Sequence, residues 1–143
     1  MKRNFVIASF LTICLVVSAQ AQKSETNVEA VKQAVESYLH KTNENVLHPE
    51  AKIISVDGTG KRLIESSFKP GKLKKGETIG ASRQSIVSLS LTEGGASVAV
   101  ETEFLADENS PITPFKHTQY ISLLKINGEW KIVSILMPPV TYM

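Results

Sequence analysis

The segment YISLLKINGEWKIV, residues Tyr120–Val133, carries the clearest structural signal in the chain. At its centre, Asn127-Gly128 is the strongest two-residue hairpin signal in the chain. It joins two predicted strands, Lys116–Ile126 and Glu129–Met137. Both faces of this hairpin are substantially apolar, which indicates central strands that are covered on two sides.

Pairing these strands around the turn assigns each side chain to a face. One face receives the pairs Leu123–Ile132, Ile121–Ser134 and Gln119–Leu136, together with Trp130 and His117; the other receives Tyr120–Ile135, Ser122–Val133 and Leu124–Lys131. We expect a helix to cover the first face. A pocket lining, a partner subunit or a long loop is expected to cover the second.

A second hairpin is predicted over Ser85–Leu91 and Ala96–Phe104, around Gly94-Gly95. Its register puts Leu91 opposite Val98, Leu89 opposite Val100 and Val87 opposite Thr102 on an apolar face; Ser90–Ala99, Ser88–Glu101 and Ile86–Glu103 form the other, mostly polar face. Glu101 and Glu103 are therefore expected to face solvent.

One amphipathic helix is predicted upstream of the sheet, over Val28–Lys41, with Thr26 as its N-cap and Glu29 completing a capping box. Its apolar stripe consists of Val28, Val31, Val35, Tyr38 and Leu39. The remaining elements are a short helical turn before Pro49, strands over Ile53–Val56 and Arg62–Ile64, and loops over Phe68–Ser82 and Asp107–Pro114.

Residues 1–21 have the pattern of a cleaved signal peptide. Lys2 and Arg3 precede an apolar run from Phe5 to Val17, and Ala19-Gln20-Ala21 is a small-x-small cleavage site. The alternatives are a retained apolar anchor and a lipoprotein acylated at Cys14, although Ile13 is too large for the position before a lipobox cysteine. We expect a periplasmic or secreted domain, residues 22–143, with no stable membrane anchor after cleavage.

The composition of this domain excludes several chemistries. Cys14 is the chain's one cysteine, so the mature domain has neither disulfides nor cysteine ligands. The leader carries two of the sixteen basic residues and none of the fourteen acidic ones, which leaves the domain neutral. We therefore expect no nucleic-acid partner. The histidine spacing gives no metal signature, and no cofactor is indicated.

The order of elements and three motifs resemble a known family. The motifs are VKQAVESYL at Val31–Leu39, LHPEAKI at Leu47–Ile53 and YISLLKINGEWKIV at Tyr120–Val133. They are similar to the lumazine-binding family of the nuclear-transport-factor-2-like (NTF2-like, SnoaL-like) superfamily. The resemblance implies an α+β NTF2-like cone, with the N-terminal helix packed on a curved, mostly antiparallel β-sheet, and commonly a homodimer. The stretch between the helix and His48 is shorter than is usual in that family.

Tyr38, His117, Gln119 and Ser134 are the candidate ligand-binding residues. The predicted register places the last three on one face, and Tyr38 closes the helix stripe over it. A few polar groups in an apolar cone are typical of a small-molecule site. The alternative is a partly exposed His117 at a strand end and a core Tyr38.

Other polar residues have plain structural explanations. His48 fits a turn cap or, alternatively, a general base, and His40 fits the end of the helix. Four lysines, Lys69, Lys72, Lys74 and Lys75, fit a solvated loop or an anion-gripping lid.

Three functions remain open on these residues. The first is a non-catalytic binding module for a small planar or apolar ligand. The second is a structural or interaction domain whose cone is filled by Phe68, Phe104 and Phe115. The third is a dehydratase or isomerase, which would need a carboxylate inside the cone. A homodimer is expected, because Tyr120, Leu124 and Ile135 would otherwise expose a sizeable apolar patch.

Overall fold

A computed structural model covers the 143-residue chain, and it describes residues 4–40, 43–57, 59–67, 82–105 and 113–142. Of residues 4–21, 44, 141 and 142 only the backbone is described. The predicted loop at Phe68–Ser82, with its lysines and Phe68, lies almost wholly outside these ranges, as does most of the loop at Asp107–Pro114.

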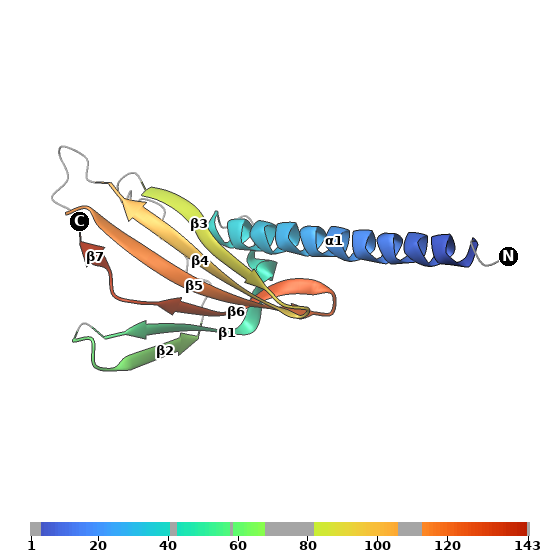
Figure 1. Ribbon diagram of the computed structural model, residues 1–143. Coiled ribbons are helices and arrows are strands. Elements are labelled where there is room, and N and C mark those ends of the chain that lie inside the picture. Colours follow the sequence, from blue (N-terminus) through green and yellow to red (C-terminus); the bar gives the residue numbers. More distant parts are fainter. Residues whose placement is uncertain (1–3, 41–42, 58, 68–81, 106–112, 143) are drawn as a thin grey trace.

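One long helix precedes the sheet (Figure 1). Helix α1 spans Asn4–Leu39, and its C-terminal turns lie over one face of the sheet. Within the described residues, no helical stretch has the length and apolarity that a membrane span requires. The predicted start of the helix is wrong in this structure, because the Thr26 hydroxyl donates to the Gln22 carbonyl at 2.9 Å within a continuing helix instead of capping it. The helix ends close to the predicted residue, with the His40 amide bonded to the Glu36 carbonyl.

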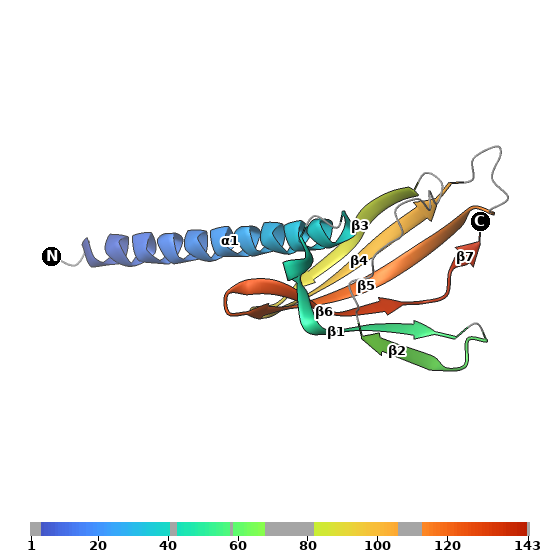
Figure 2. The ribbon, with the colours of Figure 1, turned by 180° about the vertical axis from the view of Figure 1, so that it is seen from behind.

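The strands form one sheet in the order β2-β1-β6-β5-β4-β3, with β7 also paired to β5 (Figures 1 and 2). Their bounds are β1 Leu47–Val56, β2 Leu63–Ser67, β3 Ser82–Leu91, β4 Gly95–Phe104, β5 Phe115–Ile126, β6 Glu129–Met137 and β7 Thr141–Tyr142, and the short 3-10 helix η1, Glu44–Val46, precedes β1. All pairings are antiparallel except β1 with β6. The α+β class and the central position of β5 and β6 are as predicted from the sequence.

The hairpin of β5 and β6 follows the predicted register only near its turn. Asn127 and Gly128 have φ of 52° and 84°, as a two-residue hairpin turn of this kind requires. Leu123 pairs with Ile132 as predicted. Beyond that pair an extra residue, Val133, interrupts β6, so that Ser122 pairs with Ser134 and Ile121 with Ile135. The predicted faces of Ser134, Ile135 and Leu136 are therefore wrong.

The hairpin of β3 and β4 also departs from the predicted register. Leu91 pairs with Ala96 rather than Val98, because four residues, Thr92–Gly95, separate the last pair of this hairpin instead of the two in the predicted register. The Thr92 amide donates to the Gly95 carbonyl, and the Gly95 amide donates to the Thr92 hydroxyl. This shift of the pairing by two residues leaves each side chain between Ser88 and Leu91 on its predicted face. At Val87, however, an extra residue interrupts β3, and the side chains from Ile86 to Ser82 lie on the face opposite to the one that the predicted register would give. Ile86 consequently pairs with Val100 on the inner face, and Val87 is 56% exposed.

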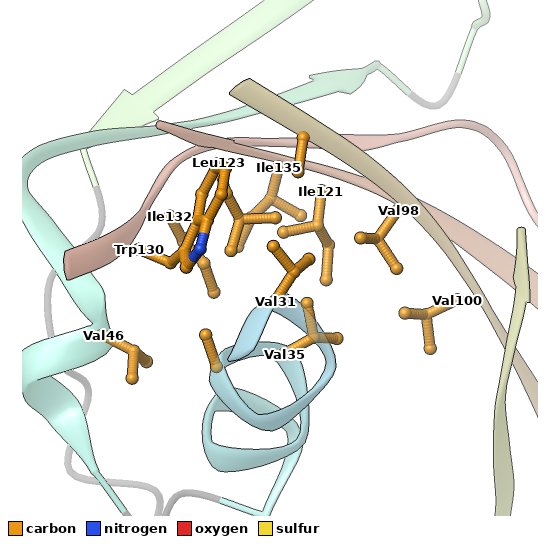
Figure 3. Packing of buried hydrophobic residues seen from close by; sticks show 12 residues of the cluster. Val31, Val35, Val46, Val98, Val100, Ile121, Leu123, Trp130, Ile132 and Ile135 are labelled. Atoms are coloured by element: carbon orange, nitrogen blue, oxygen red, sulfur yellow. The ribbon is translucent and has the colours of Figure 1, made fainter. Parts of the chain in front are cut away.

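The core lies between α1 and the face of the sheet that we call the inner face (Figure 3). Val31 and Val35 of α1 are fully buried against it. The sheet contributes Val98, Val100, Ile121, Leu123, Trp130, Ile132 and Ile135, each 7% exposed or less. Trp130 is buried as predicted.

The opposite, outer face of the sheet is partly apolar and partly charged. Lys116 forms ion pairs there with Glu101 at 3.3 Å and Glu103 at 2.7 Å. This agrees with the prediction that neither carboxylate points into the cone. Tyr120, Leu124 and Leu136 are each more than 40% exposed. Leu136 thus occupies the place predicted for Ile135, which is in the core.

Candidate functional site

Cross-strand rows of side chains run along the inner face of β3, β4 and β5. The first three rows are Leu91–Ala96–Leu123, Leu89–Val98–Ile121 and Ile86–Val100–Gln119; the next two are Gln84–Thr102–His117 and Ser82–Phe104–Phe115. The rows change from apolar to polar at Gln119, close to where α1 ends at Leu39. The strands continue past the end of the helix (Figure 1). The polar rows therefore lie at the end of the inner face that the apolar stripe of α1 covers least.

We call Thr102, His117 and Gln119 the inner polar cluster. Thr102 is directly opposite His117 across β4 and β5, and Gln119 is two residues further along the same face of β5. Thr102 is only 3% exposed. In the described part of the chain, Thr102 Oγ1, His117 Nδ1 and Gln119 Oε1 are all buried and have no hydrogen-bond partner. Three neighbouring buried atoms of this kind are unusual, because native proteins pair nearly all such groups.

Burial keeps the titratable groups of this region uncharged. Desolvation lowers the pKa of His117 below its ordinary value, so the imidazole is neutral at pH 7. Desolvation also raises the pKa of Tyr38, which favours its neutral phenol. In the described part of β3, β4 and β5, the inner-face neighbours of His117 are Gln84, Thr102, Gln119 and two phenylalanines. These positions hold no carboxylate or ammonium group.

An aromatic pair borders the inner polar cluster. Phe104 and Phe115 face each other in the row beyond Thr102 and His117. Their rings are stacked, with centroids 4.4 Å apart and planes inclined by 24°. They offer apolar, planar surface beside the polar atoms, which is the composition typical of a site for a small organic molecule.

A hollow of about 210 Å³ opens between the end of α1 and the edge strand β3. Its lining residues are Glu36, Leu39, His40, Ser82, Gln84, Ser85 and Ile86. Gln84, one of these lining residues, is the cross-strand neighbour of Thr102.

The structure brings together only part of the predicted site. His117 and Gln119 share the inner face of β5. Tyr38, at the end of α1, packs against the hydrophobic core. Ser134 does not join them. The extra residue at Val133 turns Ser134 to the outer face, where it pairs with Ser122 and with Lys52.

Thr102 and Gln84 were not among the predicted site residues. Thr102 could have been found, since it is the one polar residue in the alternating apolar series Val98, Val100, Thr102. Gln84 could not, because its face depends on the irregularity at Val87.

The other two histidines have structural partners. His48 Nδ1 accepts the Glu50 amide at 3.2 Å, which is the turn-capping role proposed from the sequence. His40 closes the last turn of α1 through its backbone amide. A second, open hollow of about 400 Å³ lies at the other end of the sheet, lined by Asn43, Asn45, Val46, Glu129, Trp130 and Lys131. There Lys131 donates to the Asn45 carbonyl at 2.7 Å and pairs with Glu129.

Solved structures resemble this chain in fold. For an NTF2-like protein of unknown function from Shewanella baltica OS155, the aligned region covers 82% of this chain and 96% of that protein, with a TM-score of 0.60 and 16% identity. For an NTF2-like protein of unknown function from Silicibacter pomeroyi DSS-3, the aligned region covers 82% of this chain and 98% of that protein, with a TM-score of 0.57 and 16% identity. For a third such protein, from Methylobacillus flagellatus KT, the aligned region covers 78% of this chain and 90% of that protein, with a TM-score of 0.55 and 17% identity.

Comparison by sequence gives no closer assignment. No protein-family model and no curated protein sequence matches the chain. The structural likeness spans most of each chain at low identity, and it establishes the fold and not a function. The chain has an NTF2-like fold.

Proposed function

We propose that this NTF2-like chain is a non-catalytic binding module that holds a small planar or apolar molecule at the inner polar cluster. One observation carries the proposal: Thr102 Oγ1, His117 Nδ1 and Gln119 Oε1 are buried together without partners in the described residues. A bound molecule would supply those partners.

A purely structural role does not explain this cluster. Leaving a buried polar group without a hydrogen bond costs about 1–3 kcal/mol. A domain that needed only a filled cone would gain stability from an apolar residue at position 102, among Val98 and Val100. The stacked pair Phe104–Phe115 fills part of the cone, but it lies in the row beyond the polar atoms and leaves them unsatisfied.

An enzyme of the dehydratase or isomerase type is the less favoured alternative. Such an enzyme needs an acid–base pair inside the cone. Among the described residues, the inner-face positions around His117 offer it no carboxylate partner. Glu101 and Glu103 are paired with Lys116 on the outer face.

Three finer statements belong to the same proposal. Similarity of Val31–Leu39 and Tyr120–Val133 to the lumazine-binding family favours a planar heterocycle as ligand. The leader at residues 1–21 supports export to the periplasm or beyond the cell. The exposed apolar residues Tyr120, Leu124 and Leu136 support a homodimer formed through the outer face.

A thermal-shift screen tests the binding role. Protein purified after expression of the full chain is screened against pterins, flavins and other planar heterocycles. A ligand at a hundred times its dissociation constant stabilises the protein by about 2.7 kcal/mol, which the screen can detect. The double variant His117→Ala with Gln119→Ala should lose the shift, whereas Ser122→Ala, on the outer face, should keep it. If the double variant keeps the shift as Ser122→Ala does, the ligand binds at a site other than the inner polar cluster.

A further inference from the structure

The first residue of the mature chain, under the proposed export, is a glutamine on an exposed helical segment. Cleavage after Ala21 leaves Gln22 at the start. Residues 22–26 are all exposed, and the N-terminal part of α1 extends beyond the sheet (Figures 1 and 2). In the described part of the chain, the hydrogen bond between α1 and the sheet that lies nearest to Gln22 runs from Lys125 Nζ to Asn27 Oδ1, at 3.0 Å. Packing therefore leaves the side chain of Gln22 unrestrained.

A glutamine at the first position carries two groups that react with each other. Its α-amino nitrogen attacks Cδ of its own side-chain carboxamide and closes a five-membered lactam. The bond between this nitrogen and Cδ forms, the bond between Cδ and Nε2 breaks, and Nε2 leaves as ammonia with a proton from the α-amino group. The reaction needs no oxidant and no co-reactant. α-Amino groups titrate close to neutral pH, so an unprotonated, nucleophilic fraction is present there.

We propose that Gln22 is a modification site, at which the exported protein is converted to an N-terminal pyroglutamyl lactam that removes the charge from the start of α1. The inference rests on the export and cleavage that form part of the proposed function, and it is independent of the ligand. The exposure of residues 22–26 supports it, because the ring can close without displacing any packed side chain.

The lactam changes the electrostatics at the start of the helix. The Thr26 hydroxyl donates to the Gln22 carbonyl at 2.9 Å, so residue 22 belongs to the first helical turn of the mature chain. An α-ammonium group there lies at the positive end of the helix dipole and next to Lys23, which is unfavourable. Cyclisation removes this charge and leaves Glu25 to balance Lys23. It also removes the free α-amine that aminopeptidases require.

Intact mass and N-terminal sequencing follow the conversion. The full chain is expressed in a bacterium that exports it, and the freshly isolated protein should have the mass of residues 22–143. On ageing at mildly alkaline pH, and faster with added glutaminyl cyclase, the mass should fall by one ammonia molecule and N-terminal sequencing should become blocked. The matched control is Gln22→Asn, whose amine would have to close a strained four-membered ring. The mass of this variant should not fall.

Thermal melting tests the effect on the helix. The cyclised protein should melt about 1–3 °C above the amine form, because the repelled charge is gone. The difference should shrink at about 1 M salt, which screens the charge. Cyclase treatment of Gln22→Asn should leave its Tm unchanged. Equal Tm values for the two wild-type forms at low salt would overturn the stabilising effect of the lactam on α1.

The outcomes separate this inference from the proposals on which it rests. If the first residue is not Gln22, or the leader is retained, the proposed cleavage is wrong and the lactam inference falls with it. If Gln22 is first but neither ageing nor cyclase lowers the mass, the cleavage stands and the lactam inference is overturned. Binding at the inner polar cluster is decided separately, by the thermal-shift screen.

Discussion

Thr102 and His117 face each other across β4 and β5, and each carries a buried polar atom that no described residue satisfies. Val98 and Val100, on the same face of β4, are fully buried in the apolar core. A polar pair in that position costs stability in the free protein. Sites that are built to bind commonly carry such a cost.

Replacing Thr102 by valine should therefore stabilise the unliganded protein. The substitution removes an unsatisfied hydroxyl and keeps the side-chain shape, so the free energy of unfolding should rise by about 1 kcal/mol. Urea unfolding and thermal melting measure this, with about 3–5 °C expected in Tm. The control is Ser122→Ala, which should change little. A less stable Thr102→Val would mean that the hydroxyl has a partner in the free protein.

Stability should depend on the protonation of His117. Burial lowers its pKa in the folded state, so the unfolded chain binds more protons as the pH falls below about 6.5. The free energy of unfolding should thus decrease from pH 7.5 downward, and the loss is complete once the pH is below the lowered native pKa. The carboxyl groups of Asp57, Glu103 and Glu129, whose pKa values are also lowered, affect stability only at more acidic pH.

Two measurements check this pH dependence. The imidazole resonances of His117 should titrate below pH 6.5 in NMR spectra. Urea midpoints at pH 7.5 and 5.5 should differ less in His117→Gln than in the wild type. An unshifted or raised NMR pKa would contradict the burial of this side chain.

The irregularity at Val133 predicts a large contrast between adjacent residues. Ile135 is 1% exposed and Leu136 is 41% exposed. Ile135→Ala should cost about 2–5 kcal/mol of unfolding free energy, as buried isoleucines do, whereas Leu136→Ala should cost well under half of that. Equal losses of unfolding free energy, or a larger loss in Leu136→Ala, would contradict the extra residue at Val133 and favour the uninterrupted register.

The sequence predicts the frame of this fold because its strongest signals are local. Asn127-Gly128 fixes one hairpin, and the stripe containing Val31 and Val35 fixes the face of α1 that is buried. The extra residues at Val87 and Val133 leave no such local signature, since both interrupt continuous strand-forming segments.

These irregularities decide which part of the site could be predicted. No irregularity interrupts β5 itself between the turn at Asn127-Gly128 and the residues His117 and Gln119. Simple alternation of side chains along the strand therefore predicts that these two residues share a face. Ser134 lies one residue beyond Val133, so the same alternation assigned it to the wrong face. Thr102 was visible as a polar residue in an apolar series, but only its unsatisfied hydroxyl marks it as functional.

The outer face should form a homodimer interface. Tyr120 and Leu136 are exposed there as a cross-strand pair of β5 and β6, and Leu124 is exposed further along β5, beyond the Ser122–Ser134 pair. Light scattering at tens of micromolar should give twice the mass of one chain, and Tyr120→Lys should reduce it to that of a monomer. A monomeric wild type would contradict the prediction.

Export should remove the leader. The intact mass of the exported protein should correspond to residues 22–143, with Gln22 as its first residue. An acylated Cys14 or a retained apolar segment would show that residues 1–21 have another role.

Mapping of a bound ligand by NMR tests whether the inner polar cluster is the binding site. A hit from the heterocycle screen is titrated into isotopically labelled protein, and shifts are followed for the Gln119 side-chain amide, the His117 imidazole and the Thr102 backbone amide. Binding at the inner polar cluster should move these signals together and saturate them with one affinity, while the signals of Ser122 and Ser134 stay in place. Shifts confined instead to Asn45, Trp130 and Lys131, around the hollow at the other end of the sheet, would contradict it.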